Sequence, residues 1–200
     1  MFTGLVSTIG RIETVTPRGE LTRARIAYVA PAEEIAVGAS IACSGPCLTV
    51  AARGAADGKT WFEVDLGAET LARTTARHWR AGTRLNLERS LKAGDELGGH
   101  VVTGHIDGVA RILGIDAFDG MKRFAIEVPP RLGRFVAVKG SVSLDGTSLT
   151  VNEIKGGCFS VLLIPHTLAV TTWDERQTGD EVNLEVDLMA RYAARLLELD

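Results

Sequence analysis

The sequence predicts a mainly all-β protein in which two small antiparallel barrels follow one another and a single helix ends the chain. The first observation is an internal repeat: Val-Thr-Gly at 102–104, followed by Arg-Ile at 111–112, matches Phe-Thr-Gly at 2–4, followed by Arg-Ile at 11–12, at an offset of 100. The second is that each half holds about six short apolar or alternating segments between frequent turn residues, with no room for long crossover helices. The 200 residues therefore divide into two modules rather than one large domain.

Two further blocks support the duplication. Ser141–Val151 matches Ser40–Val50 at an offset of 101, and Phe159–Thr172 matches Phe62–Thr75 at 97. Asn-Leu-Glu at 183–185 matches the same triplet at 86–88, again at 97. The expected division of the chain is a first barrel at 1–98, a second barrel at 99–187 and a terminal helix at 188–200.

Patterning places the elements of the first module. The strands expected there are Phe2–Val6 (before a turn near Gly10), Thr22–Val29, the two halves of Ser40–Val50, Lys59–Leu66 and Thr83–Glu88. Short helices are expected at Pro31–Glu34, where proline occupies its favoured early position, and at Glu69–Trp79. The second module is expected to repeat this order.

The tail has no counterpart in the first module. From Leu188 the apolar period changes from two to about 3.6, and Met189, Tyr192, Leu196 and Leu199 form a seam on one side of a helix. A helix of about a dozen residues is not stable alone. Two interpretations remain: the helix packs on its own barrel, or it associates with copies of itself.

Composition excludes several classes of protein. A net charge of -3 and an apolar content of 46% indicate a globular protein without a nucleic-acid-binding or polybasic membrane surface. We expect no signal peptide and no membrane span, because the start lacks a basic segment and the apolar runs are short. Cys43, Cys47 and Cys158 show no CxxC pairing, so we expect reduced thiols in the cytoplasm, with neither disulfide nor zinc site.

No metal-ligand spacing, phosphate-binding loop or nucleophile elbow is present in the sequence, and the glycines of 94–104 open no long helix. Function is therefore sought in what the two modules share. The shared residues are Thr3 and Thr103, Gly4 and Gly104, Gly45 and Gly146, Thr70 and Thr167, and the Leu-Thr-Val triplets at 48–50 and 149–151. They predict two similar pockets in which a flat polar ligand meets backbone groups.

The modules also differ at positions that carry reactive groups. The unlike pairs are Cys47 and Ser148, Ser44 and Asp145, Leu5 and His105, and residues 67–69 against 164–166. Each of the polar residues also has a structural explanation when taken singly. Cys47 suits a core, His100 a turn, and His105, Lys139 and Asp187 a solvated surface.

Four stretches taken together carry a resemblance. They are Met-Phe-Thr-Gly at the start, Ser-Ile-Ala-x-x-Gly-x-Cys-Leu-Thr-Val from Ser40, Gly-Asp-x-Leu-Gly-Gly-His-x-Val-x-Gly-His-x-Asp-Gly from Gly94, and Gly-Ser-Val-x-Leu-Asp-Gly-x-Ser-Leu-Thr-Val from Gly140. The whole chain closely resembles the riboflavin synthase family, whose members have tandem lumazine-binding repeats. The resemblance implies two six-stranded antiparallel Greek-key barrels and a homotrimer held by C-terminal helices. It leaves open an association with a lumazine synthase shell.

The resemblance also implies the reaction. Two molecules of 6,7-dimethyl-8-ribityllumazine, one donating four carbons and one receiving them, would yield riboflavin and 5-amino-6-(D-ribitylamino)uracil without a metal or redox cofactor. The alternative is a non-catalytic antenna protein of the same family that carries a lumazine or flavin, and a flavin reductase on a similar barrel is a more distant one. Retention of both repeats, Cys47 and His105 favours the enzyme.

The family's site residues map onto this chain as follows. The first pocket is expected to contain Gly4, Leu5, Val6, Cys47, Leu48, Thr49, Asp65, Leu66, Gly67, Ala68, Glu69 and Thr70. The second is expected to contain Gly104, His105, Ile106, Lys139, Ser148, Leu149, Thr150, Ile164, Pro165, His166, Thr167, Leu168 and Ala169. The positions associated with activity are Ser40, Cys47, His105 and Asp187. The chain departs from the family pattern at Ser7 (often Glu), Ser44 (usually Asn), Pro46 (an apolar residue or Cys) and His166 (often Glu).

Overall fold

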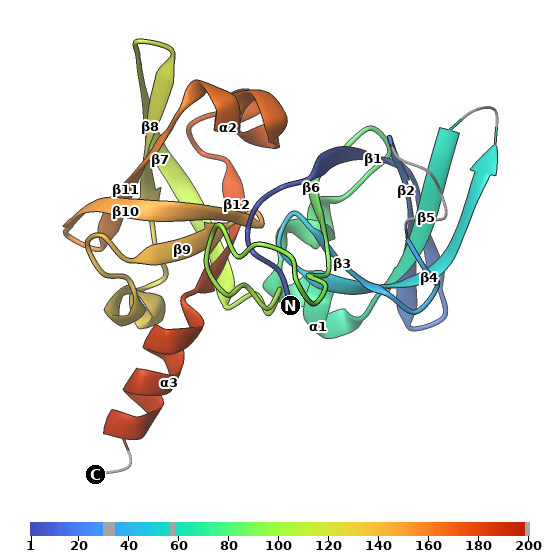
Figure 1. The fold of residues 1–200 in the computed structure, drawn as a ribbon, viewed down its shortest axis with the longest axis horizontal. Coiled ribbons are helices and arrows are strands. Elements are labelled where there is room, and N and C mark those ends of the chain that lie inside the picture. Colours follow the sequence, from blue (N-terminus) through green and yellow to red (C-terminus); the bar gives the residue numbers. More distant parts are fainter. Residues whose placement is uncertain (30–34, 57–58, 199–200) are drawn as a thin grey trace.

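The structure is a computed structural model that describes residues 1–29, 35–56 and 59–198. It contains two closed six-stranded antiparallel barrels lying side by side, with a helix that projects from the second (Figure 1). Within the described residues no helix is long and apolar enough to cross a membrane. The short helix expected at Pro31–Glu34 lies outside the described residues.

The first barrel closes in the strand order β1-β2-β5-β4-β3-β6. Its strands are β1 (Thr8–Arg18), β2 (Leu21–Tyr28), β3 (Ser40–Cys43), β4 (Cys47–Ala56), β5 (Lys59–Leu66) and β6 (Arg84–Arg89). Between β5 and β6 lie the short helix α1 (Ala68–Arg73) and the 3-10 helix η2 (Thr75–His78). The predicted alternation of β2 is confirmed, because Ala24, Ile26 and Tyr28 are buried in the barrel.

The second barrel repeats this order. Its strands are β7 (Gly108–Phe118), β8 (Met121–Glu127), β9 (Ser141–Leu144), β10 (Thr147–Lys155), β11 (Cys158–Leu163) and β12 (Glu181–Val186). Its helices are η3 (Pro130–Phe135), α2 (Pro165–Val170) and η4 (Thr172–Glu175), and α3 (Leu188–Leu197) follows β12. Register shifts between β1 and β2 and between β4 and β5 recur at the equivalent places between β7 and β8 and between β10 and β11, so the bulges that bend the strands were duplicated as well.

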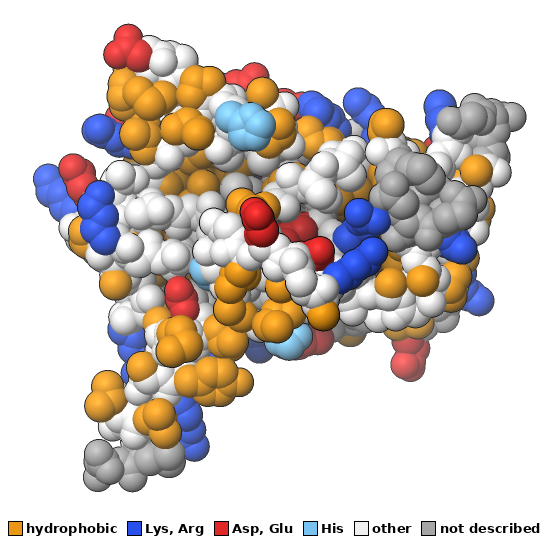
Figure 2. All heavy atoms as spheres, in the orientation of Figure 1, with side chains coloured by type: hydrophobic (Ala, Val, Ile, Leu, Met, Phe, Trp, Pro, Cys, Tyr) orange, Lys and Arg blue, Asp and Glu red, His pale blue; other side chains and the backbone are white. Residues whose placement is uncertain are grey.

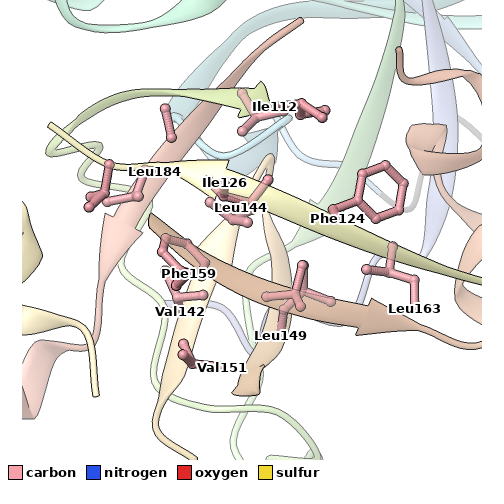
Figure 3. Packing of buried hydrophobic residues seen from close by; sticks show 14 of the residues in the cluster. Ile112, Phe124, Ile126, Val142, Leu144, Leu149, Val151, Phe159, Leu163 and Leu184 are labelled. Atoms are coloured by element: carbon pink, nitrogen blue, oxygen red, sulfur yellow. The ribbon is translucent and has the colours of Figure 1, made fainter. Parts of the chain in front are cut away.

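Each barrel has its own apolar core. In the second barrel, aliphatic side chains from all six strands surround Phe124 and Phe159 (Figure 3). The Trp173 ring packs edge-to-face on Phe124 with 4.8 Å between ring centroids, and its Nε1 donates to Thr147 Oγ1. A third, smaller cluster joins the barrels through Phe2, Ala42 and Val102.

Two predicted elements of the first module are wrong. Phe2–Val6 is not a strand of the first barrel: Phe2 forms an isolated antiparallel bridge with Val102 of the second repeat. Gly10 makes no turn either, since β1 runs through it. A Cβ at Gly10 would lie 2.6 Å from Leu87 Cδ1 and 2.8 Å from Ile26 Cγ2, so close packing requires the glycine.

The helix predicted at Glu69–Trp79 is interrupted. Thr74 has φ −128° and ψ 167°, which is extended backbone, and it separates α1 from η2. Its hydroxyl donates to Thr70 O at the end of α1 and accepts from Ala76 N at the start of η2. Thr171 repeats both bonds between α2 and η4, so the break belongs to the module.

Candidate active site

We call the first of two candidate surfaces the Cys47 ledge. It lies around Cys47–Thr49, at the start of β4. Antiparallel pairing places Val50 opposite Val64, which brings the end of β5 and the following α1 level with Cys47–Thr49. A segment of the second repeat completes the ledge, because Cys47 N donates to Gly104 O at 2.9 Å. Cys47 is half-buried, while Thr49 and His105 are exposed.

The second surface, here the Ser148 ledge, is the equivalent place on the second barrel. Val151 lies opposite Val161, so the end of β11 and the following α2 reach the level of Ser148–Thr150. Ser148 N donates to Gly4 O at 2.8 Å. Ser148 is half-buried and Thr150 is exposed.

Each ledge includes a segment from the other repeat, and this differs from the expected grouping. Gly4–Val6 was expected with Cys47, but Gly4 lies against Ser148 of the other barrel, and Gly104 lies against Cys47. Both glycines have φ +76°, and a Cβ on either would lie 2.5 Å from the Cβ of the residue it faces. Repeat patterns cannot reveal this exchange, because each segment resembles its counterpart. Each ledge is thus built by both repeats of one chain.

A buried glutamate holds each exchanged segment. Glu88 Oε1 accepts from Thr3 N at 2.6 Å and Thr3 Oγ1 at 2.7 Å, and its Oε2 accepts from Gly4 N at 2.9 Å. Glu185 does the same for Thr103 and Gly104, at 2.7, 2.6 and 2.8 Å. Burial raises the pKa of both carboxyl groups, and these donated hydrogen bonds partly oppose the shift.

Sequence reasoning did not select these glutamates as functional, although the repeated Asn-Leu-Glu triplet was a signal for them. We call the bonds that Glu88 and Glu185 accept from these segments the glutamate clamps. The two clamps give the two segments the same backbone conformation, but the side chains that follow are different. Leu5 N donates to Thr3 Oγ1 at 3.1 Å, and His105 N donates to Thr103 Oγ1 at 3.3 Å. A leucine and a histidine therefore leave the same turn in the two repeats.

His100 was also not among the predicted site residues. Its Nδ1 lies 2.7 Å from Ser148 Oγ, and its backbone N donates to Thr3 O at 3.1 Å. The buried Nε2 atom has no hydrogen-bond partner among the residues that the structure describes. Burial lowers the pKa of the imidazole, while the charge of Asp187 opposes that shift. The hydrogen-bonding partner of His100, Ser148, comes from 48 residues away and left no sequence signal.

Comparison with known proteins shows the family to which this chain belongs. The lumazine binding domain model matches twice, at residues 3–90 and 103–187. Riboflavin synthase of Brucella abortus (strain 2308) is 51% identical over 199 residues, which cover 99% of this chain and 98% of the relative. The chain belongs to the riboflavin synthase family. Riboflavin synthase of Mycobacterium bovis (strain ATCC BAA-935 / AF2122/97) is 38% identical over 98% of both chains.

Solved structures in the same fold include LumP complexed with riboflavin, with a TM-score of 0.80 and 25% identity over 93% of this chain and 99% of that one. LumP complexed with 6,7-dimethyl-8-(1'-D-ribityl) lumazine has a TM-score of 0.78 at 23% identity, with the same coverage, which shows likeness of fold. The riboflavin synthases are thus the nearer relatives in sequence among these.

The positions that the sequence analysis expected to carry activity divide between the ledges. Ser40 on β3 lies opposite Thr49 on β4, so it shares the Cys47 ledge with Cys47 and His105. Asp187 lies at the end of β12, near enough to His100 to affect its charge, on the side of the Ser148 ledge. Its carboxylate also caps α3, accepting from Met189 N at 2.8 Å.

Several expected binding residues already have other contacts. Asp65 forms a paired interaction with Arg23, at 2.8 and 2.7 Å, which lowers the pKa of its carboxyl. Lys139 is exposed in a left-handed turn (φ 66°), with its backbone N bonded to Val151 O beside the Ser148 ledge. Glu69 and His166 are exposed on α1 and α2 and face solvent in one chain.

Three of the family departures are held by local structural contacts, and Ser44 among them has a left-handed backbone with φ 49°. Ser7 Oγ donates to Leu87 O at 3.0 Å, and Ser44 Oγ accepts from Asn86 N at 3.0 Å. Pro46 is buried in the β3–β4 turn, where its carbonyl accepts from Cys43 N.

Among the described residues no group of three or more His, Cys, Asp or Glu side chains is placed to hold a metal ion.

Proposed function

We propose that this chain is a riboflavin synthase that converts two molecules of 6,7-dimethyl-8-ribityllumazine into riboflavin and 5-amino-6-(D-ribitylamino)uracil, the last step of riboflavin biosynthesis. The observation that carries the proposal is a duplicated ledge with unlike side chains: Cys47 where the other has Ser148, and His105 where the other has Leu5. Two identical substrates in unequal roles need two similar but unequal sites. The 51% identity to a riboflavin synthase over nearly the whole chain supports the same activity.

The chemistry asks little of the protein beyond positioning. The 7-methyl group of the lumazine is acidic because its anion delocalises into the ring, so a modest base and donors to the developing charge suffice. We assign the base to His105, whose imidazole can accept a proton from the methyl group, and reversible addition to the second ring to Cys47, Ser40 or a water that they hold. Asp187 and His100 would act from the Ser148 ledge. We place the two substrates against the residues of the two expected pockets, with the segment of Gly104 assigned to the Cys47 ledge and the segment of Gly4 to the Ser148 ledge.

The ledges are open in one chain, so a second subunit would cover them. The α3 seam supports this proposal, because Met189, Tyr192 and Leu196 are 77%, 59% and 67% exposed. Figure 2 shows hydrophobic side chains gathered on the projecting helix. Leu199 of the predicted seam lies outside the described residues. We propose a cytoplasmic homotrimer formed through α3, in which ledges of neighbouring chains face one another, and leave association with a lumazine synthase as a secondary proposal.

The experiment is to incubate the purified protein with the lumazine alone and to measure riboflavin by absorbance and chromatography. We expect one riboflavin for two lumazines consumed, since the transfer of four carbons balances without an added cofactor. Tight lumazine binding without product would favour the antenna function instead, for which likeness of fold to LumP is the supporting observation.

A further inference from the structure

The two barrels meet through neutral contacts that are nearly identical in both directions. Asn86 Nδ2 donates to Asp145 O and its Oδ1 accepts from Thr172 N. Asn183 Nδ2 donates to Ser44 O and its Oδ1 accepts from Thr75 N. Because each repeat carries the same asparagine, threonine and turn carbonyl, these bonds would form equally well between two copies of the same repeat. The neutral contacts therefore do not select a partner.

The charged side chains around these contacts are different in the two repeats. Equivalent positions, offset by 97, carry basic side chains in the first repeat and acidic ones in the second: Arg77 against Asp174, His78 against Glu175 and Arg84 against Glu181. In the chain, Arg77 Nη2 lies 2.6 Å from Glu181 Oε2 and His78 Nε2 lies 3.2 Å from the same atom. Arg84 pairs with Glu175. At the positions that pair across the pseudo-symmetric interface, the first repeat thus presents Arg77, His78 and Arg84, and the second presents Glu175 and Glu181.

We propose that this rim, defined as Arg77, Arg84, Glu175 and Glu181, makes the interface specific for unlike repeats. A first-repeat barrel fits a second-repeat barrel, while a second copy of the same repeat is repelled. If two first-repeat barrels met through the same surface, Arg84 of one would face Arg77 and His78 of the other. Two second-repeat barrels would bring Glu181 against Glu175. Like charges at matched positions are a means by which proteins reject wrong partners.

Selection of this kind matters for a chain with two homologous barrels. An oligomer brings homologous barrels of neighbouring chains to a high local concentration, so the tether between the repeats does not by itself decide which barrels pair. Mispaired barrels would give two ledges of one kind. The inference rests on the ion pairs and the repeat, and it does not depend on the proposed reaction.

The test compares two double variants of the full chain that have the same composition and net charge. R84E/E175R inverts one ion pair and keeps the attraction between unlike repeats, but it also replaces the like-charge contacts between like repeats by attractive ones. R84E/E181R places two carboxylates together at one pair and cationic groups together at the other, while it makes pairing between like repeats attractive. Thermal unfolding at low salt and sedimentation velocity at several protein concentrations are measured for both variants and the unaltered chain.

We expect R84E/E175R to unfold within about 2 °C of the unaltered chain and R84E/E181R about 4–8 °C lower, with the difference shrinking in 1 M salt. R84E/E181R alone should also form an additional, concentration-dependent species, because only in this variant is the pairing of unlike repeats within the chain repulsive. Equal unfolding temperatures of the two variants, or a difference that salt leaves unchanged, would overturn the electrostatic pairing. A destabilised R84E/E181R that forms no additional species would overturn the exclusion of like repeats.

Discussion

At the scale of single residues, the decisive feature is that equivalent backbone positions of the two repeats carry different side chains: Cys47 where the other has Ser148, and His105 where the other has Leu5. We predict that Cys47→Ala and His105→Ala each lower kcat more than they weaken lumazine binding, and that loss of the His105 base costs about a hundredfold in kcat. Both residues differ from their repeat counterparts, as unequal substrate roles require. Single-turnover kinetics and ligand titration on the same preparations separate the two effects.

Cys158→Ala is the matched control, because Cys158 is also a half-buried free thiol but lies at the start of β11, away from both ledges. It should leave kcat unchanged. Full turnover in Cys47→Ala or His105→Ala would return that residue to a purely structural role.

The glutamate clamps give a second prediction at this scale. Glu88→Gln should lower the free energy of unfolding by about 1–3 kcal/mol, because the amide of glutamine would turn one N–H toward donors on Thr3 or Gly4. Glu185→Gln should behave alike. Chemical denaturation measures the loss. Glu153→Gln, on an exposed part of β10, is the control and should stay within about 0.5 kcal/mol of the unaltered chain. A neutral result at Glu88 would show that the clamp contributes little to stability.

His100 predicts a dependence of stability on pH. Burial holds the imidazole pKa below its ordinary value of 6.5, so the unfolded chain binds the proton more tightly than the folded protein does. Stability should therefore fall as pH decreases from 6.5 toward the folded pKa, and the slope should vanish below it. His100→Asn should remove this component, measured as the difference in urea midpoints at pH 7.5 and pH 5. His166→Asn, at an exposed position, should retain it.

At the scale of elements, alternation and turn chemistry were sufficient wherever a strand pairs within its own barrel. Lys59–Leu66 is β5 as predicted, and Ser40–Val50 contains β3, the Ser-Gly-Pro turn and the start of β4. The prediction at Phe2–Val6 was wrong because its partner, Val102, belongs to the other repeat. The same physical cause hid the exchange between the ledges, because contacts between the two repeats leave no periodicity in the sequence.

The terminal helix was predicted from its period, but its attachment was not. Asp107 forms a paired interaction with Arg191 of α3, at 2.6 and 2.9 Å, and also accepts from Val186 N. We predict that Asp107→Asn lowers the unfolding temperature by several degrees and loosens α3, measured by hydrogen exchange of the helix amides. Glu198→Gln breaks a contact with Arg134 that is exposed on both sides and should change neither quantity measurably. Unchanged exchange in Asp107→Asn would show that α3 is held by other contacts.

At the scale of the whole molecule, the structure favours self-association of the terminal helix over its packing on its own barrel. The described part of the seam does not pack on its own barrel: Met189, Tyr192 and Leu196 are exposed while ionic contacts hold the opposite side of α3. Such a helix orients an apolar surface outward, and a partner surface would stabilise it. We propose a second copy of the same seam as this partner, because an oligomer of this kind would also cover the open ledges.

The last prediction tests this assembly without truncating the chain. Tyr192→Glu with Leu196→Glu should convert the oligomer to monomers while both barrels remain folded, because neither side chain is buried in the chain. Since each ledge is built within one chain, the monomer should still bind the lumazine, but it should not bring two lumazines together, and riboflavin formation should fall at least about a hundredfold. Val29→Glu with Val37→Glu, two exposed valines of the first barrel, is the matched control for added charge. Sedimentation, lumazine titration and riboflavin formation are measured on one sample, and a fully active monomer would mean that both substrates meet within a single chain.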